Sequence, residues 1–248
     1  MIRFDPDKTA LFNPSSLDLV GNPTKALMIF DDEVWEDYVK KQDNIKVFSV
    51  KNTKGKMFND FFMYKFGQEN ILLVSPASGA GGSAMSAVDM ELLIASGINK
   101  IVAFGTCGAM DIKIAKNTII IPNSVFREEG VSYHYLPPSD EIAQEDNSIS
   151  VMNNLFSKHK IPFLNGKAWT TDAVYRETAE KFLTMKNNGC IAVDMELASL
   201  IAVAKFRNIN FAGFLITDDN ICEKKSHEVN GRDLAKLFQA ALDIVTKI

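Results

Sequence analysis

The sequence predicts an α/β fold in which short buried strands alternate with helices. Apolar runs of strand length recur along the chain and are separated by segments with helical patterning. The composition is that of a globular protein, with 46% hydrophobic and 23% charged residues among 248. Since no linker, low-complexity tract or internal repeat interrupts the alternation, we expect residues 1–248 to form a single domain.

The N-terminal part contains four expected strands and two expected helices. A polar helix over 32–41 follows the first strand. A second helix, over 83–96, ends at Gly97, because glycine readily adopts the left-handed conformation that closes a helix. The expected strands span residues 26–30, 45–50, 57–66 and 71–75.

The remainder of the chain continues the alternation. Strands over 100–105 and 118–122 are β-branched and apolar, as expected for strands covered on both faces. The polar segment 124–147 is predicted to be the longest irregular stretch, and long loops in compact domains are usually functional or disordered. The other expected elements are helices over 147–159, 177–188, 195–207 and 231–247, and strands over 167–171, 190–194 and 211–217.

Charge and composition exclude several classes of partner. The formal net charge is -4, so no basic field is available to attract nucleic acid or anionic lipid. No apolar run approaches the roughly 20 residues of a membrane helix, and the N-terminus lacks a signal-peptide core, so we expect a cytoplasmic protein. The widely spaced Cys107, Cys190 and Cys222 indicate reduced thiols and neither a disulfide frame nor a metal site.

Two apolar runs end in carboxylates about two dozen residues apart. Residues 191–196 end in Asp194-Met195-Glu196, and residues 215–219 end in Asp218-Asp219. Ligands of open α/β sheets bind outside the carboxyl ends of the strands, where one carboxylate can hold a polyol and another can move a proton. The alternative interpretation is structural: Asp194 would be the N-cap of the next helix, and the other two aspartates would cap a loop.

Two glycine-rich segments follow predicted strands. Residues 78–83, which include Gly81, allow close approach of a ligand to the backbone before a helix N-terminus; the alternative is a tight turn with Ser83 as N-cap. Residues 105–109 place Thr106 between two glycines and could form a hydrogen-bonding floor or a tight turn. Cys107 is a weak candidate nucleophile, since no histidine partner can be assigned to it.

The segment 127–138 contains Arg127, His134 and two tyrosines. Binding groups are often carried by such loops, although a solvated surface loop would have the same composition.

Together, these motifs resemble the nucleoside phosphorylase and nucleosidase superfamily, which includes bacterial purine nucleoside and uridine phosphorylases. The resemblance rests on residues 105–109, 193–196 and 217–218, matching in order and spacing over about 70–220. The 127–138 segment is similar to a loop of uridine phosphorylases. The resemblance implies a three-layer α/β/α sandwich around a twisted mixed β-sheet. It also implies a homo-oligomer (dimer, trimer or hexamer) with sites near subunit interfaces, where we expect His134 to act.

The resemblance implies that a group of matched residues surrounds a nucleoside. Their implied roles are ribose hydroxyl binding by Glu196, packing beneath the sugar by Met195, contact with the base by Val193 and Val174, phosphate contact by Thr106, and protonation of purine N7 by Asp218.

The implied activity is that of a nucleoside phosphorylase, a pentosyltransferase of purine salvage. It would cleave the N-glycosidic bond of a purine nucleoside with phosphate as co-substrate, without a cofactor or metal, and release free base and ribose 1-phosphate. The alternatives are a hydrolytic nucleosidase, a uridine phosphorylase and a non-catalytic nucleoside-binding protein.

Departures from the family pattern concern the nucleophile and the base. Ala103 stands where phosphorylases have a phosphate-binding arginine, so we expect Arg127 or Arg176 to supply the missing charge. Residues 28–33 replace the phosphate loop and resemble the start of hydrolytic nucleosidases, in which Glu33 would position water. The Gln and Arg that recognise uracil in uridine phosphorylases are replaced by Thr178 and Glu180, which is evidence against that route of uracil recognition.

Overall fold

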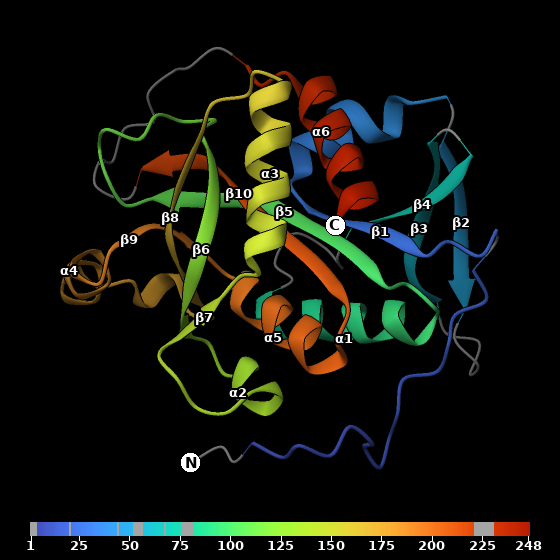
Figure 1. Ribbon diagram of the computed structural model, residues 1–248, viewed down its shortest axis with the longest axis horizontal. Helices are drawn as coiled ribbons and strands as arrows, with labels where there is room; N and C mark the ends of the chain where they lie inside the picture. The colour runs from blue at the N-terminus through green and yellow to red at the C-terminus, as the bar shows by residue number, and fades with distance from the viewer. Residues whose placement is uncertain are drawn as a thin grey trace.

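The computed structural model describes residues 4–19, 21–43, 45–51, 57–66, 68–75, 82–220 and 231–248 (Figure 1). Ten strands in this part of the chain form one mixed sheet. They are β1 (Lys25–Phe30), β2 (Ile45–Lys51), β3 (Met57–Phe66), β4 (Glu69–Val74), β5 (Lys100–Ala109), β6 (Ile119–Glu128), β7 (Glu141–Ala143), β8 (Phe163–Thr171), β9 (Cys190–Asp194) and β10 (Asn210–Asn220).

The strands β4, β1, β5 and β10 lie side by side and are parallel to one another. Their carboxyl ends therefore meet at one edge of the sheet. β10 also pairs antiparallel with β6, and the pairings continue through β8 and β9 back to β5. These five strands form a closed ring, while β3 and β2 extend the sheet on the other side as antiparallel strands.

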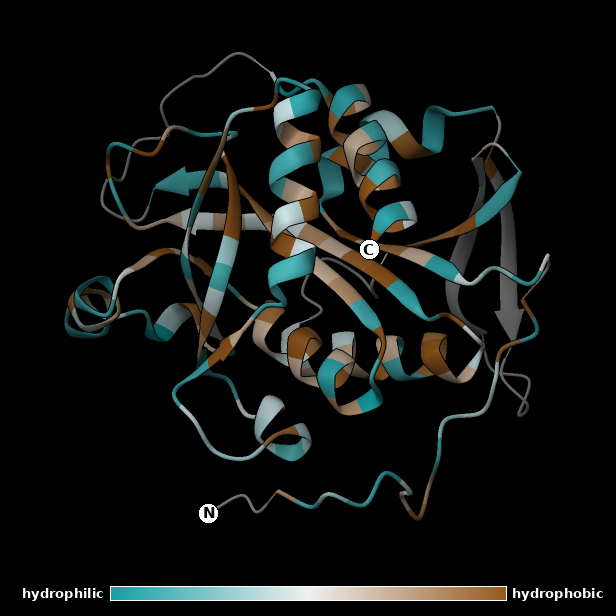
Figure 2. Ribbon diagram, in the orientation of Figure 1, coloured by the Kyte–Doolittle hydropathy of each residue, from teal (hydrophilic) through white to brown (hydrophobic). Residues whose placement is uncertain are grey.

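Helices cover both faces of the sheet, as expected for a three-layer sandwich (Figure 1). One face packs against α1 (Gly82–Ala95) and α5 (Leu197–Arg207), and the other against α3 (Asp146–Lys158) and α6 (Leu234–Lys247). The remaining helices are the one-turn α2 (Ser132–Tyr135) and α4 (Ala179–Asn187). Figure 2 shows the hydrophobic colouring concentrated on the central strands and on the sides of the helices that face them.

The sequence of α6 shows why it forms this layer. Its apolar residues recur at intervals of three and four, and Leu237, Phe238, Leu242 and Val245 are all buried against the sheet. The carboxylate of Asp233 caps the helix by accepting a hydrogen bond from the backbone N–H of Lys236 at 3.0 Å.

The expected helical stretch over 32–41 is confirmed, although its geometry is irregular: a π-helix spans Val34–Tyr38 and a 3-10 turn follows over Val39–Lys41. Two other sequence-based predictions about the elements were wrong. The supposed turn at 105–109 is the continuation of β5, whose pairing with β10 includes these residues. The segment 124–147 is mostly regular, because β6 runs on to Glu128 and α2 and β7 follow before α3 begins.

Candidate active site

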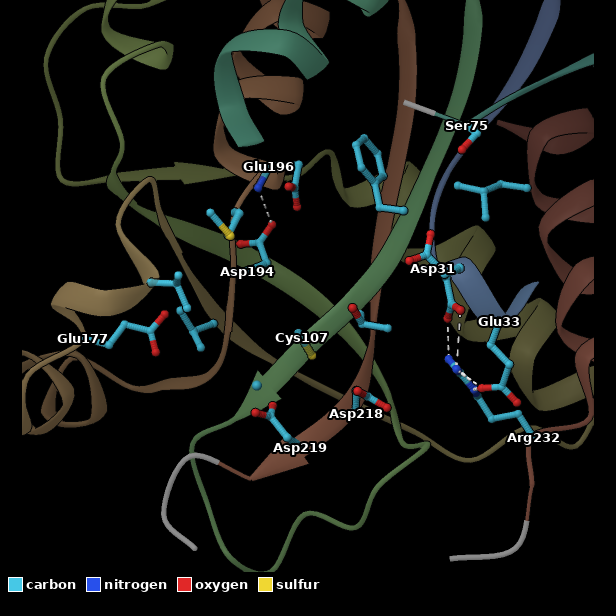
Figure 3. A pocket seen from close by; sticks show the side chains of 18 residues that line it. Asp31, Glu33, Ser75, Cys107, Glu177, Asp194, Glu196, Asp218, Asp219 and Arg232 are labelled. Atoms are coloured by element: carbon cyan, nitrogen blue, oxygen red, sulfur yellow. Dashed lines mark hydrogen bonds and ion pairs between the residues drawn. The ribbon is translucent and has the colours of Figure 1, made fainter. Parts of the chain in front are cut away.

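A cavity of about 530 Å³ lies at the carboxyl ends of β1, β4, β5, β9 and β10 (Figure 3). Its position is the one expected for a ligand site in an α/β sheet. The described residues that line it are Ile29, Phe30, Asp31, Asp32, Glu33, Ser75, Thr106, Cys107, Gly108, Val174, Glu177, Val193, Asp194, Met195, Glu196, Asp218, Asp219 and Arg232.

The turn between β9 and α5 places Asp194, Met195 and Glu196 at the cavity. Asp194 is 4% exposed, and its Oδ2 accepts hydrogen bonds from the backbone N–H groups of Glu196 at 3.0 Å and Leu197 at 2.7 Å. Its Oδ1 accepts a third bond from the Thr170 hydroxyl at 2.6 Å. The N-cap residue of α5 is Glu196 and not, as the structural interpretation had expected, Asp194, but the Asp194 carboxylate binds the backbone N–H groups at the start of the helix and fixes the turn that presents Glu196.

Glu196 is connected to the N-terminus of α1. Its Oε1 accepts a hydrogen bond from the Gly82 N–H at 3.2 Å, and the Ser83 hydroxyl donates to the Met195 carbonyl at 2.8 Å. Ser83 thus contacts the β9–α5 turn and lies within α1, not at its N-cap. Gly81, predicted to bind the ligand, lies outside the described residues.

Burial raises the pKa of both carboxyl groups in this turn, those of Asp194 and Glu196. Burial raises the pKa of Glu196 to about 8, and the neighbouring Asp194 adds to the effect. Burial likewise raises the pKa of Asp194 to about 6, although its hydrogen bonds oppose the shift. Glu196 accordingly has a carboxyl group that a ligand with hydroxyl donors could hydrogen-bond in either protonation state.

A β-bulge in β10 brings two neighbouring carboxylates to the same cavity. Thr217 pairs with Cys107 and Asp219 with Gly108, so Asp218 is an additional residue in the ladder. In a regular strand, adjacent side chains point to opposite faces, whereas here both Asp218 and Asp219 line the cavity. Asp218 forms an ion pair with Lys116 at 3.0 Å. Burial and the proximity of Asp218 raise the pKa of Asp219.

The carboxyl end of β1 supplies a second group of acids. Arg232, which precedes α6, pairs with Asp31 and Glu33; its Nε donates to Glu33 Oε2 at 2.9 Å, and its Nη2 also reaches Asp31 Oδ1 at 3.4 Å (Figure 3). The Asp31 side chain is buried, and burial raises its pKa despite the opposing effect of Arg232. The guanidinium is therefore held by two carboxylates of its own chain.

The position of the missing phosphate arginine is apolar. Ala103 is 2% exposed in β5 and packs in the core. Two residues further along β5, Gly105 packs closely against Phe30. A Cβ atom at position 105 would lie only 2.5 Å from the Phe30 Cβ, which is too close for a side chain. Phe30 also lines the cavity, so an aromatic side chain stands where β1 ends beside β5.

Val174 and Glu177, from the segment before α4, line the cavity, and Figure 3 shows Glu177 beside it. Val174 is 46% exposed, while Glu177 is partly buried, and burial raises the pKa of its carboxyl group. Thr178 and Glu180, which occupy the uracil-reading positions, are exposed and do not line the cavity.

Three consecutive residues of β5 line the cavity, and the first of them is Thr106, one of the residues expected there from the sequence. Cys107 lines it too, but burial raises the pKa of its thiol well above the usual value, which opposes a role as nucleophile.

Arg127, Arg176 and His134 do not line the described cavity. Arg127 is 3% exposed and donates to the Ser132 hydroxyl at 2.8 Å and to the Pro137 carbonyl at 2.9 Å, which fixes the loop around α2. Arg176 and His134 are exposed. Within this chain, neither arginine replaces the missing phosphate ligand. The expected action of His134 across a subunit interface stays a prediction.

The lining is strongly acidic. Of the described lining residues, eight are Asp or Glu, and Arg232 is the single cation. The described parts of the chain contain no group of three or more His, Cys, Asp or Glu side chains arranged to hold a metal ion. In the same residues, no helix is long and apolar enough to cross a membrane. The carboxylates that line the cavity suit hydrogen bonding to hydroxyl groups, proton transfer and the stabilisation of positive charge.

Sequence analysis missed several of these residues. Asp31 and Asp32 follow a predicted strand, which was a usable signal. Glu177 lies three residues after Val174, but its direction depends on how the segment before α4 turns. Arg232 belongs to no motif, since its place in the site depends on ion pairs with residues about 200 positions away.

Comparison with known proteins identifies the family. Residues 24–248 match the model of the phosphorylase superfamily. A DeoD-type purine nucleoside phosphorylase of Colwellia psychrerythraea is 33% identical over 172 residues, which cover 68% of this chain and 73% of that protein. Uridine phosphorylase of Vibrio fischeri has a similar structure (TM-score 0.73, 18% identity, 91% and 92% of the two chains). So does AMP nucleosidase of Bacteroides thetaiotaomicron (TM-score 0.68, 18% identity, 90% and 88%). The chain therefore belongs to the phosphorylase superfamily of nucleoside-cleaving enzymes.

Proposed function

We propose that this protein cleaves the N-glycosidic bond of a purine nucleoside. The observation that carries the proposal is the convergence of Glu196 and Asp218 on one cavity from two separate strand ends. Glu196 would bind the vicinal hydroxyls of the ribose, with Met195 against the sugar. Asp218 would donate a proton to the base as the bond from C1′ to the base nitrogen breaks. Purine relatives support the assignment of the base.

We favour water as the nucleophile. Phosphate carries about two negative charges and is usually bound by arginine or by clustered backbone donors. The described lining opposes such an anion, because its carboxylates outnumber the single guanidinium, which Asp31 and Glu33 already hold. The same argument disfavours substrates with a 5′-phosphate. Glu33 would orient the water, and its ion pair with Arg232 would hold the carboxylate in place.

In this mechanism, the proton given up by Asp218 leaves with the base, and the hydroxyl of water is added to C1′. The second proton of the water returns to a carboxylate of the cavity, so the products are free base and free ribose. Positioning and electrostatic stabilisation of the developing positive charge on the sugar would provide most of the rate acceleration.

Phosphate is the second candidate nucleophile, favoured by the relatives that are named purine nucleoside phosphorylases. The two reactions are separated by incubating adenosine, inosine and uridine with and without phosphate and identifying the sugar product. We expect purine release without phosphate and free ribose as product. Strict dependence on phosphate with formation of ribose 1-phosphate would establish phosphorolysis. Binding of nucleosides without any cleavage would indicate a nucleoside-binding protein.

A further inference from the structure

Glu177 is the lining carboxylate that neither the motifs nor the proposed mechanism uses. It lies just after the 3-10 turn Val174–Arg176, and its side chain points into the cavity (Figure 3). In the described part of the chain, no hydrogen-bond donor or cation pairs with this carboxylate. By contrast, Asp31, Glu33 and Asp218 have ion-pair partners and Asp194 has three hydrogen bonds.

The surroundings of Glu177 add negative charge. Asp219, brought to the cavity by the bulge in β10, and Glu128 both act on it electrostatically. Lys116 pairs with Asp218 and Lys181 pairs with Glu128, while the exposed Arg176, adjacent in sequence, forms no ion pair with Glu177 among the described residues. Burial and these acids raise the pKa of Glu177, and no cation of the described chain opposes that shift.

The element that carries Glu177 also carries Val174, whose position the family resemblance assigns to the base. An unpaired carboxylate at the base would gain most from a ligand that brings the missing positive charge. We propose that Glu177, supported by Asp219, is a specificity-determining residue that selects nucleosides whose base is cationic, such as purines alkylated at N7 or pyridinium bases.

The proposal deepens the proposed function by naming a substrate class. A cationic base leaves with the bonding electron pair, which neutralises its charge, so that it departs as a neutral molecule without taking a proton from Asp218. Water would still supply the hydroxyl group for C1′. The negative lining thus serves recognition of the charged base, in addition to stabilising the cationic sugar during the reaction.

The experiment uses two uncleavable bases that differ by one methyl group and one charge: 9-methyladenine, which is neutral, and 7,9-dimethyladeninium, which is a permanent cation. Their dissociation constants are measured by calorimetry at neutral pH with the full-length wild type and with Glu177→Gln. The matched control is Glu180→Gln, which removes the same charge from an exposed side chain of α4 outside the cavity.

We expect the wild type and the Glu180→Gln variant to bind the cation more tightly than the neutral base. Glu177→Gln should reduce that preference about tenfold, equivalent to about 1.4 kcal/mol. Equal affinity of the wild type for both bases would overturn the proposal, as would equal effects of the two substitutions on the preference. Because neither base has a glycosidic bond, the result does not depend on turnover. The failure of the proposed cleavage would instead appear in the nucleoside incubations described above.

Discussion

The carboxylate of Glu196 accepts a hydrogen bond from the backbone N–H of Gly82, 114 positions earlier in the chain, at 3.2 Å. The bond joins the start of α1 to the turn between β9 and α5. Two elements that are far apart in the sequence are thereby joined at the cavity. The carboxylate proposed to bind ribose is held at a helix N-terminus, where a negative charge is favoured.

Replacement of Glu196 by Gln should weaken ribonucleoside cleavage. The substitution keeps the shape but removes charge-assisted hydrogen bonds to the ribose hydroxyls, with an expected loss of about 1.5–3 kcal/mol in kcat/KM. The loss should be greatest above the pKa of about 8, where the wild-type carboxyl group is ionised. Steady-state kinetics with adenosine and with 2′,3′-dideoxyadenosine test the assignment, since the dideoxy substrate should be nearly insensitive. Unchanged kcat/KM for adenosine would rule out ribose binding by Glu196.

The buried acids of the same turn should make stability dependent on pH. The pKa of Glu196 rises from 4.5 to about 8 on folding, and that of Asp194 from 3.8 to about 6. Between the two values, each group keeps its proton in the folded state and has lost it in the unfolded state. Their contribution to the free energy of unfolding therefore falls as pH increases through that range and is constant above it.

Urea unfolding of the wild type and of Glu196→Gln between pH 4 and pH 9 tests this expectation. The variant should gain stability relative to the wild type as pH rises from about 4.5 to about 8, because the titrating group has been removed. Parallel pH profiles for the two proteins would contradict a raised pKa at this position.

Replacement of Asp218 by Asn should lower the cleavage of neutral purine nucleosides by about 10²–10⁴, the usual contribution of a general acid. The matched substrate is 7-methylguanosine, whose base leaves without needing a proton and should be affected much less. Asp219→Asn is the matched variant. If the adenosine rate falls only in Asp219→Asn, the neighbouring aspartate is the acid and the bulge presents Asp219 to the base instead.

Replacement of Arg127 by Ala should reduce stability and not nucleophile binding. Its buried guanidinium donates to the buried Ser132 and to the exposed Pro137 and Ser139, so its removal takes three hydrogen bonds and a buried side chain from the loop, at an expected cost of about 2–4 kcal/mol. Arg176→Ala, at an exposed position, should change stability by less than about 0.5 kcal/mol. Thermal unfolding measures both effects. A raised KM for phosphate in Arg127→Ala with unchanged stability would restore the role expected from the sequence.

The Cys107 thiol should be inert despite its place in the cavity. Burial raises its pKa well above the usual value, so almost no thiolate exists at neutral pH. We expect Cys107→Ala to retain wild-type kcat within a few-fold and iodoacetamide to label the wild-type residue slowly. Loss of activity in a folded Cys107→Ala variant would revive the nucleophile hypothesis.

The acids that follow apolar runs could be predicted from the sequence, because strand ends determine where their side chains lie. This applies to Asp194, Glu196 and Asp218. The partners of these groups could not be predicted. Arg232 reaches Asp31 only through the tertiary packing of α6 beside β1, and Glu177 faces the cavity only because of an irregular turn. The length of β5 was also underestimated, since its glycines indicated a turn while its pairing with β10 continues the strand through them.

The bulge in β10 has a consequence for how such a site can change. Thr217 and Asp219 pair with consecutive residues of β5, so the ladder is already in register on both sides of Asp218. Asp218 is thus an insertion that the sheet accommodates without displacing its neighbours. Gain or loss of one codon at this point would add or remove the proposed proton donor while every strand pair stayed in place. The proposed proton donor and the architecture of the sheet can therefore evolve independently.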